Sequence, residues 1–240
     1  MRMSSPTLPR RAAAEFIGTA ALVAVIVGSG IRADTLSQDI GVRLLANAAA
    51  SAVGLGLLIA LIGPLSGAHF NPVVTLSEWW SRRHERGGRE ALAYIAAQLT
   101  GAVAGALLAE AMFGRAPGGW ASEPRSAPHL LLGEAVATAG LVLVVQGLRR
   151  IGRPGLAPIA VAGYIGAAIW FTSSGSFANP AATVGRAFSD SFTGIAPASV
   201  PAFAAAQLCG MLLGLLLAGV LYGTPRAAGE PNTAEARRTG

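Results

Sequence analysis

The sequence predicts an all-α membrane protein with six transmembrane helices and two re-entrant half-helices, arranged as two inverted repeats. Three observations lead to this fold class. Of 240 residues, 52% are hydrophobic and 12% are charged, which is typical of a chain whose natural solvent is a bilayer. Six apolar runs approach the ~20 residues that cross the hydrocarbon core of a membrane. A short Asn-Pro motif occurs twice, at Asn71 and at Asn179, each time after an interrupted apolar run.

The apolar runs set the expected spans and the division of the chain. The spans lie at about 12–31, 44–62, 91–113, 130–148, 156–171 and 202–222. The first span is longer than the apolar segment of a removable signal peptide, and no small-residue cleavage site follows it. We therefore expect a permanent helix. We therefore expect a cytoplasmic N-terminus over 1–11, one membrane domain over 12–223 and a disordered cytoplasmic tail over 224–240.

The basic residues indicate the orientation of the chain. All 18 of them are arginine, and the isoelectric point is about 10.9. Most lie on one side of a six-span topology, so the positive-inside rule places both termini in the cytoplasm. This placement explains the basic charge better than nucleic-acid binding, and we expect the lipid bilayer as a partner and no nucleic acid. Cys209, the single cysteine, excludes a disulfide framework and is expected to be a small core residue.

The two halves of the chain repeat each other. Glu15 and Glu134 each precede a threonine by four residues, in spans one and four. The two Asn-Pro motifs lie 108 residues apart, and Gln98 and Gln207 lie 109 apart in spans three and six. Because each half contributes an odd number of spans, the second half enters the membrane from the opposite side. The repeats are therefore inverted, and we expect the functional site near the midplane.

Each copy of the motif is expected to start a half-helix inside the membrane. The Pro- and Gly-containing stretch 63–70 interrupts span two, and the Ser-rich stretch 172–177 interrupts span five. Asparagine suits the cap position and proline the first helical position, which predicts half-helices over 72–81 and 180–188. Irregular backbone at this depth is tolerated where it lines a cavity. The residues expected at the junction are Asn71, Pro72, Val73, Asn179, Pro180 and Ala181.

Two helix N-termini that meet at the midplane favour the passage of uncharged molecules. Their partial positive charges oppose cations, while the asparagine amides and the loop carbonyls offer hydrogen bonds to a neutral solute. An ion-coupled carrier is the alternative from another class, because inverted repeats and broken helices also build transporters. We find no metal-ligand cluster, activated nucleophile or phosphate loop, so we expect neither an enzyme nor a cofactor.

These motifs resemble those of the aquaporin and glycerol-facilitator family, the major intrinsic proteins, over about residues 12–222. The segments from Ser66 to Pro72 and from Asn179 to Arg186 carry the resemblance. It implies one channel domain with repeats at about 12–114 and 129–223, one pore per protomer, a homotetramer and a plasma-membrane location. It also implies that Glu15 and Glu134 hold the broken loops, with structural support from Gln98 and Gln207. His69 fits a role in fixing the loop or at the pore entry.

The chain departs from the family pattern at the narrow filter. Water- and glycerol-conducting members have arginine directly after the second motif, where this chain has Ala182; Arg186 matches a different family position. Ungapped counting from the motifs places Ser51, Ala167 and Ser176 at the other three filter positions, and a small gap near residue 63 would move the first of them. A filter of this composition is wide and weakly polar.

The filter decides the expected solute. A set without aromatic, histidine or arginine side chains is similar to that of a bacterial branch of the family associated with arsenite and organic arsenicals. Arsenite is an uncharged trihydroxy molecule at neutral pH, roughly the size of glycerol. We therefore expect a channel for trivalent metalloid hydroxides as well as glycerol and water. An ordinary water, glycerol or urea channel is the alternative.

Overall fold

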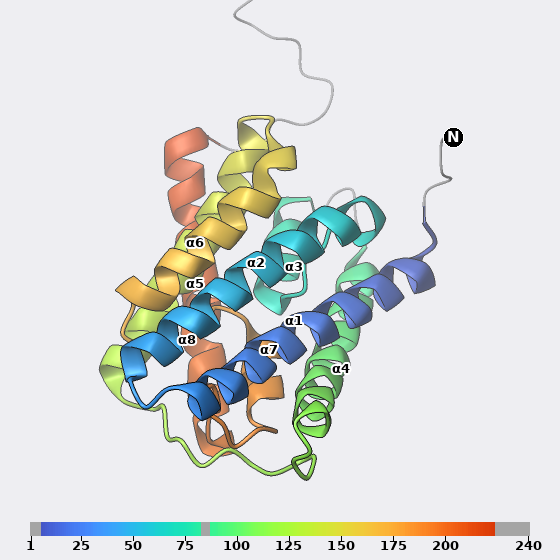
Figure 1. Cartoon of the computed structure of the whole chain (residues 1–240). Helices are drawn as coiled ribbons and strands as arrows, with labels where there is room; N and C mark the ends of the chain where they lie inside the picture. Colours follow the sequence, from blue (N-terminus) through green and yellow to red (C-terminus); the bar gives the residue numbers. More distant parts are fainter. Residues whose placement is uncertain (1–5, 83–86, 224–240) are drawn as a thin grey trace, which may run out of the picture.

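The computed structural model describes residues 6–82 and 87–223, and in these it is all-helical (Figure 1). Six helical segments are long and apolar enough to cross a membrane, and they coincide with the six expected spans, which confirms the fold class. The α-helices are α1 (Leu8–Leu36), α2 (Ile40–Ser66), α3 (Pro72–Ser81), α4 (Gly88–Met112), α5 (Pro128–Arg150), α6 (Ala157–Phe171), α7 (Pro180–Arg186) and α8 (Val200–Tyr222), with 3-10 turns η1 (Pro154–Leu156) and η2 (Pro197–Ser199).

Several helices extend beyond the expected spans or end elsewhere. α1 begins at Leu8 and so takes up part of the expected N-terminal segment. α2 continues through Pro64 to Ser66, because one proline removes only one backbone donor. Gly67 is the C-cap of the helix, and its φ of 97° lies in the left-handed region that glycine favours. α7 ends at Arg186, two residues before the expected end; the expected tail over 224–240 lies outside the described residues.

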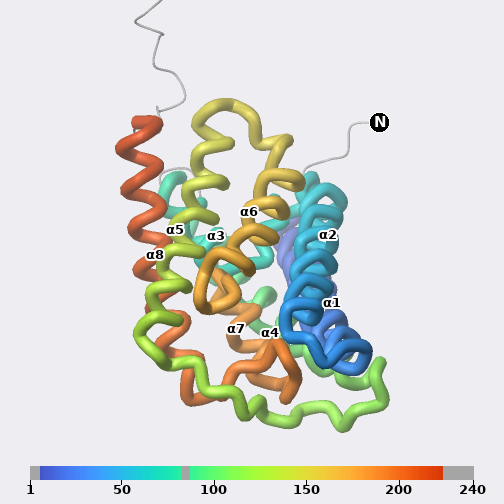
Figure 2. Tube along the Cα trace, turned by 60° about the vertical axis from the view of Figure 1, so that its left-hand side comes forward, coloured from blue at the N-terminus to red at the C-terminus, as the bar shows by residue number. Residues whose placement is uncertain are grey.

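The two repeats, α1–α4 and α5–α8, pack in the same way. α1 lies along α4 and α5 lies along α8, while α2 contacts α6 across the two repeats. Figure 2 shows the linker over residues 113–127, between α4 and α5, running across one end of the bundle, with the α5–α6 turn at the opposite end. We call these the linker end and the turn end. The half-helices α3 and α7 lie between the long helices and contact each other.

Glycines four residues apart let the long helices approach closely in both repeats. A Cβ atom on Gly101 would lie 2.5 Å from the carbonyl oxygen of Phe16, and one on Gly214 would lie 2.5 Å from that of Ala139. Gly105 and Gly210 make the matching contacts. Lipid tails are as apolar as leucine, so helices in a bilayer are held by close packing on such small residues. The internal repeat is therefore present in the packing as well as in the sequence.

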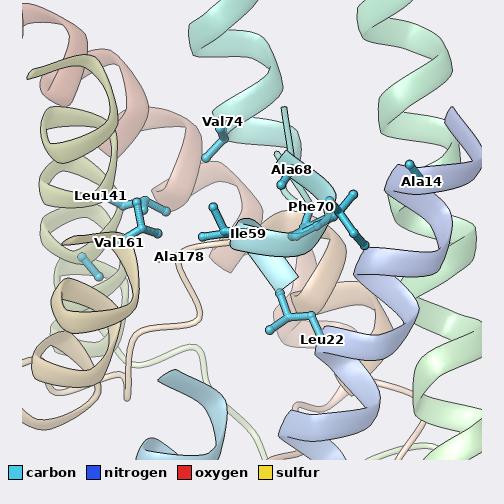
Figure 3. Packing of buried hydrophobic residues seen from close by; sticks show 11 residues of the cluster. Ala14, Leu22, Ile59, Ala68, Phe70, Val74, Leu141, Val161 and Ala178 are labelled. Atoms are coloured by element: carbon cyan, nitrogen blue, oxygen red, sulfur yellow. The ribbon is translucent and has the colours of Figure 1, made fainter. Parts of the chain in front are cut away.

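An apolar cluster joins the broken loops to the surrounding helices (Figure 3). Phe70 is fully buried, and its ring lies against Gly18 of α1, where any side chain would collide with it. Val74 of α3 belongs to the same cluster as Leu141 and Ala178 of the second repeat. This packing fixes the position of the first broken loop relative to the second.

The expectation that Cys209 is a core residue was wrong, because its thiol-bearing side chain is exposed on α8. Gln207 and Gly210 on the same helix are buried. A helix turns by ~100° per residue, so Cys209 points about 200° away from Gln207 and faces outward. In a membrane that face meets lipid or another subunit.

Candidate functional site

The two half-helices begin where the sequence predicts and are capped in the same way. Asn71 and Asn179 are the N-caps of α3 and α7, and each side-chain oxygen accepts a hydrogen bond from the backbone N–H two residues on, at 3.0 Å in both copies. Pro72 and Pro180 occupy the first helical positions. Proline and asparagine here satisfy the donors that a helix start leaves free.

Reciprocal hydrogen bonds join the two caps. Asn71 Nδ2 donates to the carbonyl oxygen of Ala178 at 2.8 Å, and Asn179 Nδ2 donates to that of Phe70 at 2.9 Å. Each amide nitrogen carries two hydrogens, so one holds the opposite loop and one is left over. Both asparagines line the central cavity, which makes this second hydrogen the one available to a solute. Val73 and Ala181, the third residues of the motifs, are fully buried and pack behind the junction.

A buried carboxylate holds the first broken loop. Glu15, on α1, is fully buried. Its Oε1 accepts from the Ser66 hydroxyl at 2.6 Å and from the His69 N–H at 3.0 Å, while its Oε2 accepts from the Phe70 N–H at 2.7 Å and from Gln98 Nε2 at 2.8 Å. Hydrogen bonds to a charged group are about twice as strong as neutral ones. Glu15 therefore fixes the loop backbone.

The second loop is held by the equivalent residues of the second repeat. Glu134 is also fully buried and accepts from the N–H groups of Phe177 and Ala178, both at 2.8 Å, and from Gln207 Nε2 at 2.6 Å. Gln207 Nε2 also donates to Thr183 Oγ1 at 2.9 Å, as Gln98 does to the equivalent threonine in α3. The supporting role that the family resemblance implies for the glutamates and glutamines agrees with this geometry.

The two broken loops adopt matching left-handed backbone conformations that residues with a Cβ atom rarely take. Ala68 and Phe70 in the first loop have φ values of 51° and 50°, and Ser176 and Ala178 in the second have 49° and 45°. Left-handed conformations cost free energy for residues with a Cβ atom, so the buried glutamates are needed to hold them. The carbonyl oxygens of residues 67, 68, 175 and 176 accept no hydrogen bond from any described residue and lie in loops that line the cavity.

His69 lies beside the first half-helix and lines the same cavity. Its Nδ1 is 3.1 Å from Thr75 Oγ1, and its ring meets Tyr94 edge-on with 5.3 Å between the ring centroids. The Tyr94 hydroxyl donates to the Ser66 carbonyl at 2.8 Å. His69 thus both contacts the path and ties the loop to α3 and α4.

One cavity of about 790 Å³ crosses the bundle between the half-helices. Its lining includes Arg125, just before the first residue of α5, and Arg149, near the last. Twenty-three helical residues span ~34 Å, slightly more than the ~30 Å of a bilayer core. The cavity therefore reaches from the linker end to the turn end, as a transmembrane path must.

The wall of the cavity opposite the broken loops is apolar. It is formed by side chains spaced one helical turn apart on α2 and α6, such as Leu55 and Ile59, and Val161, Ile165 and Ile169. Such a path offers hydrogen bonds on one side and carbon contacts on the other. Counting from the motifs did not identify this wall, although the spacing of four residues on α6 carries the signal.

Three of the four expected filter residues line the cavity. Ser51, Ser176 and Ala182 are all buried, and neither serine hydroxyl has a hydrogen-bond partner within 6–82 and 87–223. Ala167 does not join them: it is exposed on the outer side of α6, because it lies between Ile165 and Ile169 on the helix and so points away from the wall that they form. Counting from the motifs selected Ala167 but did not show on which face of α6 its side chain lies.

The two ends of the cavity differ in charge. At the turn end, Arg149 is ion-paired with Glu78, and Arg11 pairs with Glu90 through two contacts of 2.9 Å. At the linker end, Arg125 and Arg186 line the cavity, and neither forms an ion pair with a carboxylate in the described part of the chain. No motif predicted a role for Arg125, since its position depends on how the linker folds.

Comparison with known proteins agrees with this geometry. Residues 2–173 match the model of the family described as major intrinsic protein. The chain is 45% identical over 210 residues to the aquaglyceroporin AqpS of Rhizobium meliloti, covering 88% of this chain and 89% of that protein. It is 33% identical over 217 residues to the probable aquaporin AqpM of Archaeoglobus fulgidus, covering 79% and 87%.

A solved structure shares the fold. The aquaglyceroporin from Plasmodium falciparum superposes with a TM-score of 0.64 at 22% identity, covering 88% of this chain and 94% of that one. The six spanning helices, the paired half-helices and the family match lead to the same assignment. The chain belongs to the major intrinsic protein family and is a multi-pass membrane channel, not an enzyme.

Proposed function

We propose that this channel conducts small uncharged hydroxylated solutes, with trivalent arsenite passing along the same path as glycerol and water. The proposal rests on the composition of the cavity wall at the start of α7. Ala182 and Ser176 line the cavity there, at the level where water- and glycerol-conducting members of the family resembled place an arginine. A small apolar side chain leaves room that a guanidinium would fill.

The chemistry of the path suits a neutral molecule with several hydroxyl groups. The unpartnered hydroxyls of Ser51 and Ser176, the free loop carbonyls and the second N–H of each cap asparagine offer both donors and acceptors. The apolar wall of α2 and α6 requires no hydrogen bond in return. Arsenite and glycerol each carry three hydroxyl groups and no charge at neutral pH, so neither pays the cost of bringing an ion to the half-helix N-termini.

Two alternatives differ from this proposal in testable ways. An ordinary water, glycerol or urea channel would pass those solutes and exclude arsenite. A proton-coupled carrier would need a titrating carboxylate exposed to the path, whereas Glu15 and Glu134 are fully buried and their oxygens are occupied by loop donors. Glu78 is the carboxylate that lines the cavity among the described residues, and it is ion-paired with Arg149. The passive channel is therefore the better supported class.

The orientation and assembly are part of the proposal. Arg10, Arg11, Arg149, Arg150 and Arg153 lie near the turn end of the helices, which supports a cytoplasmic turn end, cytoplasmic termini and a location in the plasma membrane. Large apolar side chains are exposed around the outside of the bundle, as expected for surfaces that meet lipid or neighbouring subunits. A homotetramer with one pore per protomer would use part of this surface.

Stopped-flow light scattering of proteoliposomes tests the proposal. Vesicles holding the protein are exposed in separate runs to inward gradients of arsenite, glycerol and urea, and compared with empty vesicles. We expect faster reswelling with arsenite and glycerol. In Ala182→Arg the arsenite rate should fall at least about tenfold, which corresponds to ~1.4 kcal/mol in the barrier, while Ala182→Val, the matched control, should retain it.

The outcomes separate the alternatives. Glycerol flux without arsenite flux would leave the ordinary channel as the better description. If Ala182→Arg left the arsenite flux unchanged, in vesicles shown to contain folded protein, the argument from the wide filter would be wrong.

A further inference from the structure

We propose that Arg125 and Arg186 form an oxyanion-binding site at the linker end of the cavity. In this site a small tetrahedral oxyanion, of the chemistry of sulfate or phosphate, binds the two guanidinium groups and obstructs the path of neutral solutes. The inference rests on the cavity and on the channel assignment, and it does not depend on which neutral solute the channel carries.

Arg186 is built into the cavity wall. Its side chain is buried, with 8% of the residue exposed. Its Nε donates to the Thr193 carbonyl at 2.5 Å, and its Cζ lies 3.2 Å from the centroid of the Phe177 ring. Neither of its terminal nitrogens donates a hydrogen bond to any residue in 6–82 or 87–223. Stacking and the Nε bond therefore fix the guanidinium plane while its outer donors stay available.

Arg125 reaches the same ring from the linker. Its Nε donates to the Gly194 carbonyl at 2.8 Å and its backbone N–H to Ser199 Oγ at 2.9 Å. Its Cζ lies 5.3 Å from the Phe177 centroid. Its terminal nitrogens, like those of Arg186, have no hydrogen-bond partner among the residues described. Two guanidinium groups thus meet at one aromatic ring, and both line the cavity.

Among the described residues, neither arginine forms an ion pair with a carboxylate. The oxygens of Glu134 accept hydrogen bonds from two loop N–H groups and from Gln207, and Glu134 does not line the cavity. Among the described lining residues, Glu78 is the one carboxylate, and it pairs with Arg149 at the turn end. The charge of Glu134 attracts both arginines without contacting them, while the two arginines repel each other. Like charges away from bulk water repel strongly, so an anion bound directly between the guanidinium groups would lower this repulsion.

The donor geometry favours an oxyanion over chloride. Guanidinium groups present planar forks of N–H donors that match the oxygens of sulfate and phosphate through two parallel hydrogen bonds. A dianion with four oxygens can accept from both forks at once. Because both arginines line the cavity that crosses the bundle, an anion held between them also stands in the way of a neutral solute.

Sulfate is the probe for the experiment, with two readouts. The first is the midpoint of thermal unfolding of the detergent-purified channel in sodium sulfate and in sodium chloride at equal ionic strength. The second is osmotic water flux through proteoliposomes with and without sulfate on both sides. The variants are Arg125→Gln and, as a matched control, Arg32→Gln. Arg32 is exposed near the linker end of α1, with its Cζ 5.2 Å from the Phe113 ring, but it does not line the cavity.

We expect sulfate to raise the unfolding midpoint of the wild type and of Arg32→Gln more than that of Arg125→Gln. The comparison between variants matters because sulfate stabilises folded proteins in general. Water flux should fall by about half at a sulfate concentration equal to its dissociation constant, since half of the sites are then occupied. This inhibition should be absent in Arg125→Gln and retained in Arg32→Gln.

Equal responses to sulfate in Arg125→Gln and Arg32→Gln would overturn the proposal, as would equal responses of the wild type to sulfate and chloride. Failure of the proposed solute selectivity gives a different result, because arsenite would then be excluded while sulfate still inhibited water flux. If water flux did not exceed that of empty vesicles, the unfolding midpoints would still decide whether the oxyanion site exists.

Discussion

Replacement of Glu134 tests whether a buried carboxylate holds the second broken loop. The side chain is fully buried and accepts from the N–H groups of Phe177 and Ala178, both at 2.8 Å, and from Gln207 Nε2 at 2.6 Å. Alanine removes all three acceptors. Glutamine keeps the shape of the side chain but offers one acceptor oxygen and brings a donor to the position of the other.

The cost of each replacement follows from the donors left unpaired. With its oxygen at the Oε2 position, the glutamine of Glu134→Gln keeps the hydrogen bonds from the Ala178 N–H and Gln207 Nε2, and its amide group faces the Phe177 N–H. The Phe177 N–H then loses its acceptor, at about 1–3 kcal/mol for a buried donor. Glu134→Ala leaves three donors unpaired and opens a small cavity, so we expect roughly three times that cost.

Thermal unfolding in detergent, followed together with glycerol flux, measures the difference. For a chain of this size 1 kcal/mol corresponds to about 2–4 °C in the midpoint. We therefore expect a decrease of a few degrees for Glu134→Gln and of more than about 10 °C for Glu134→Ala, with flux reduced because the Asn179 cap is no longer fixed. Glu123→Gln, which changes an exposed carboxylate of the linker, is the control. If Glu134→Ala unfolded at the same temperature as this control, the supporting role assigned to the carboxylate would be refuted.

Two further predictions follow from the packing and from the linker. In Gly105→Leu the new side chain would collide with the carbonyl oxygen of Ala20 on α1, so we expect an overpacking cost of at least ~1–3 kcal/mol. The control is Gly219→Leu, where a Cβ meets no atom within 4 Å. Gly105→Leu should have a lower unfolding midpoint and be less monodisperse than this control. At Asp190, hydrogen bonds from the backbone N–H and then the hydroxyl of Ser122 lower the carboxyl pKa. Their stabilising effect is present above the unfolded pKa of about 3.9 and is lost as pH falls through the lower folded value. The unfolding midpoint of the wild type should therefore decrease more on acidification below about pH 4 than that of Ser122→Ala; parallel pH profiles would contradict this linkage.

The elements that the sequence predicts well are those set by local chemistry. The bounds of α3 follow from an asparagine cap, a proline at the first position and a polar end, and the structure has α3 at Pro72–Ser81 as expected. The end of α2 is predicted less well, because Gly63 and Pro64 can each remain in a helix when its other hydrogen bonds are kept. The backbone breaks at Gly67, where a positive φ is required.

The functional site also has parts that could be predicted from the sequence and parts that could not. The junction could be predicted because the Asn-Pro motif occurs in both halves, whereas the supporting role of the buried glutamates followed only from the resemblance to the family. The direction of Ala167 could not be predicted by counting, since a two-residue difference in a helix reverses the face on which a side chain lies. The position of Arg125 depends on contacts with Gly194 and Ser199, more than 60 residues further along the chain, and no local pattern encodes them.

The repeat symmetry holds at the centre of the channel and is broken at its ends. At the centre, equivalent glutamates, glutamines and asparagines hold two matching loops, so a solute meets similar hydrogen-bonding groups from both directions. At the ends, Arg149 is neutralised by Glu78, whereas Arg125 and Arg186 have no acidic partner in the described residues. Arg186 lies four residues after Ala182 in α7, one helical turn further along. A positive charge is therefore present on the cavity wall one turn beyond position 182, where it opposes the entry of cations and leaves neutral molecules unaffected.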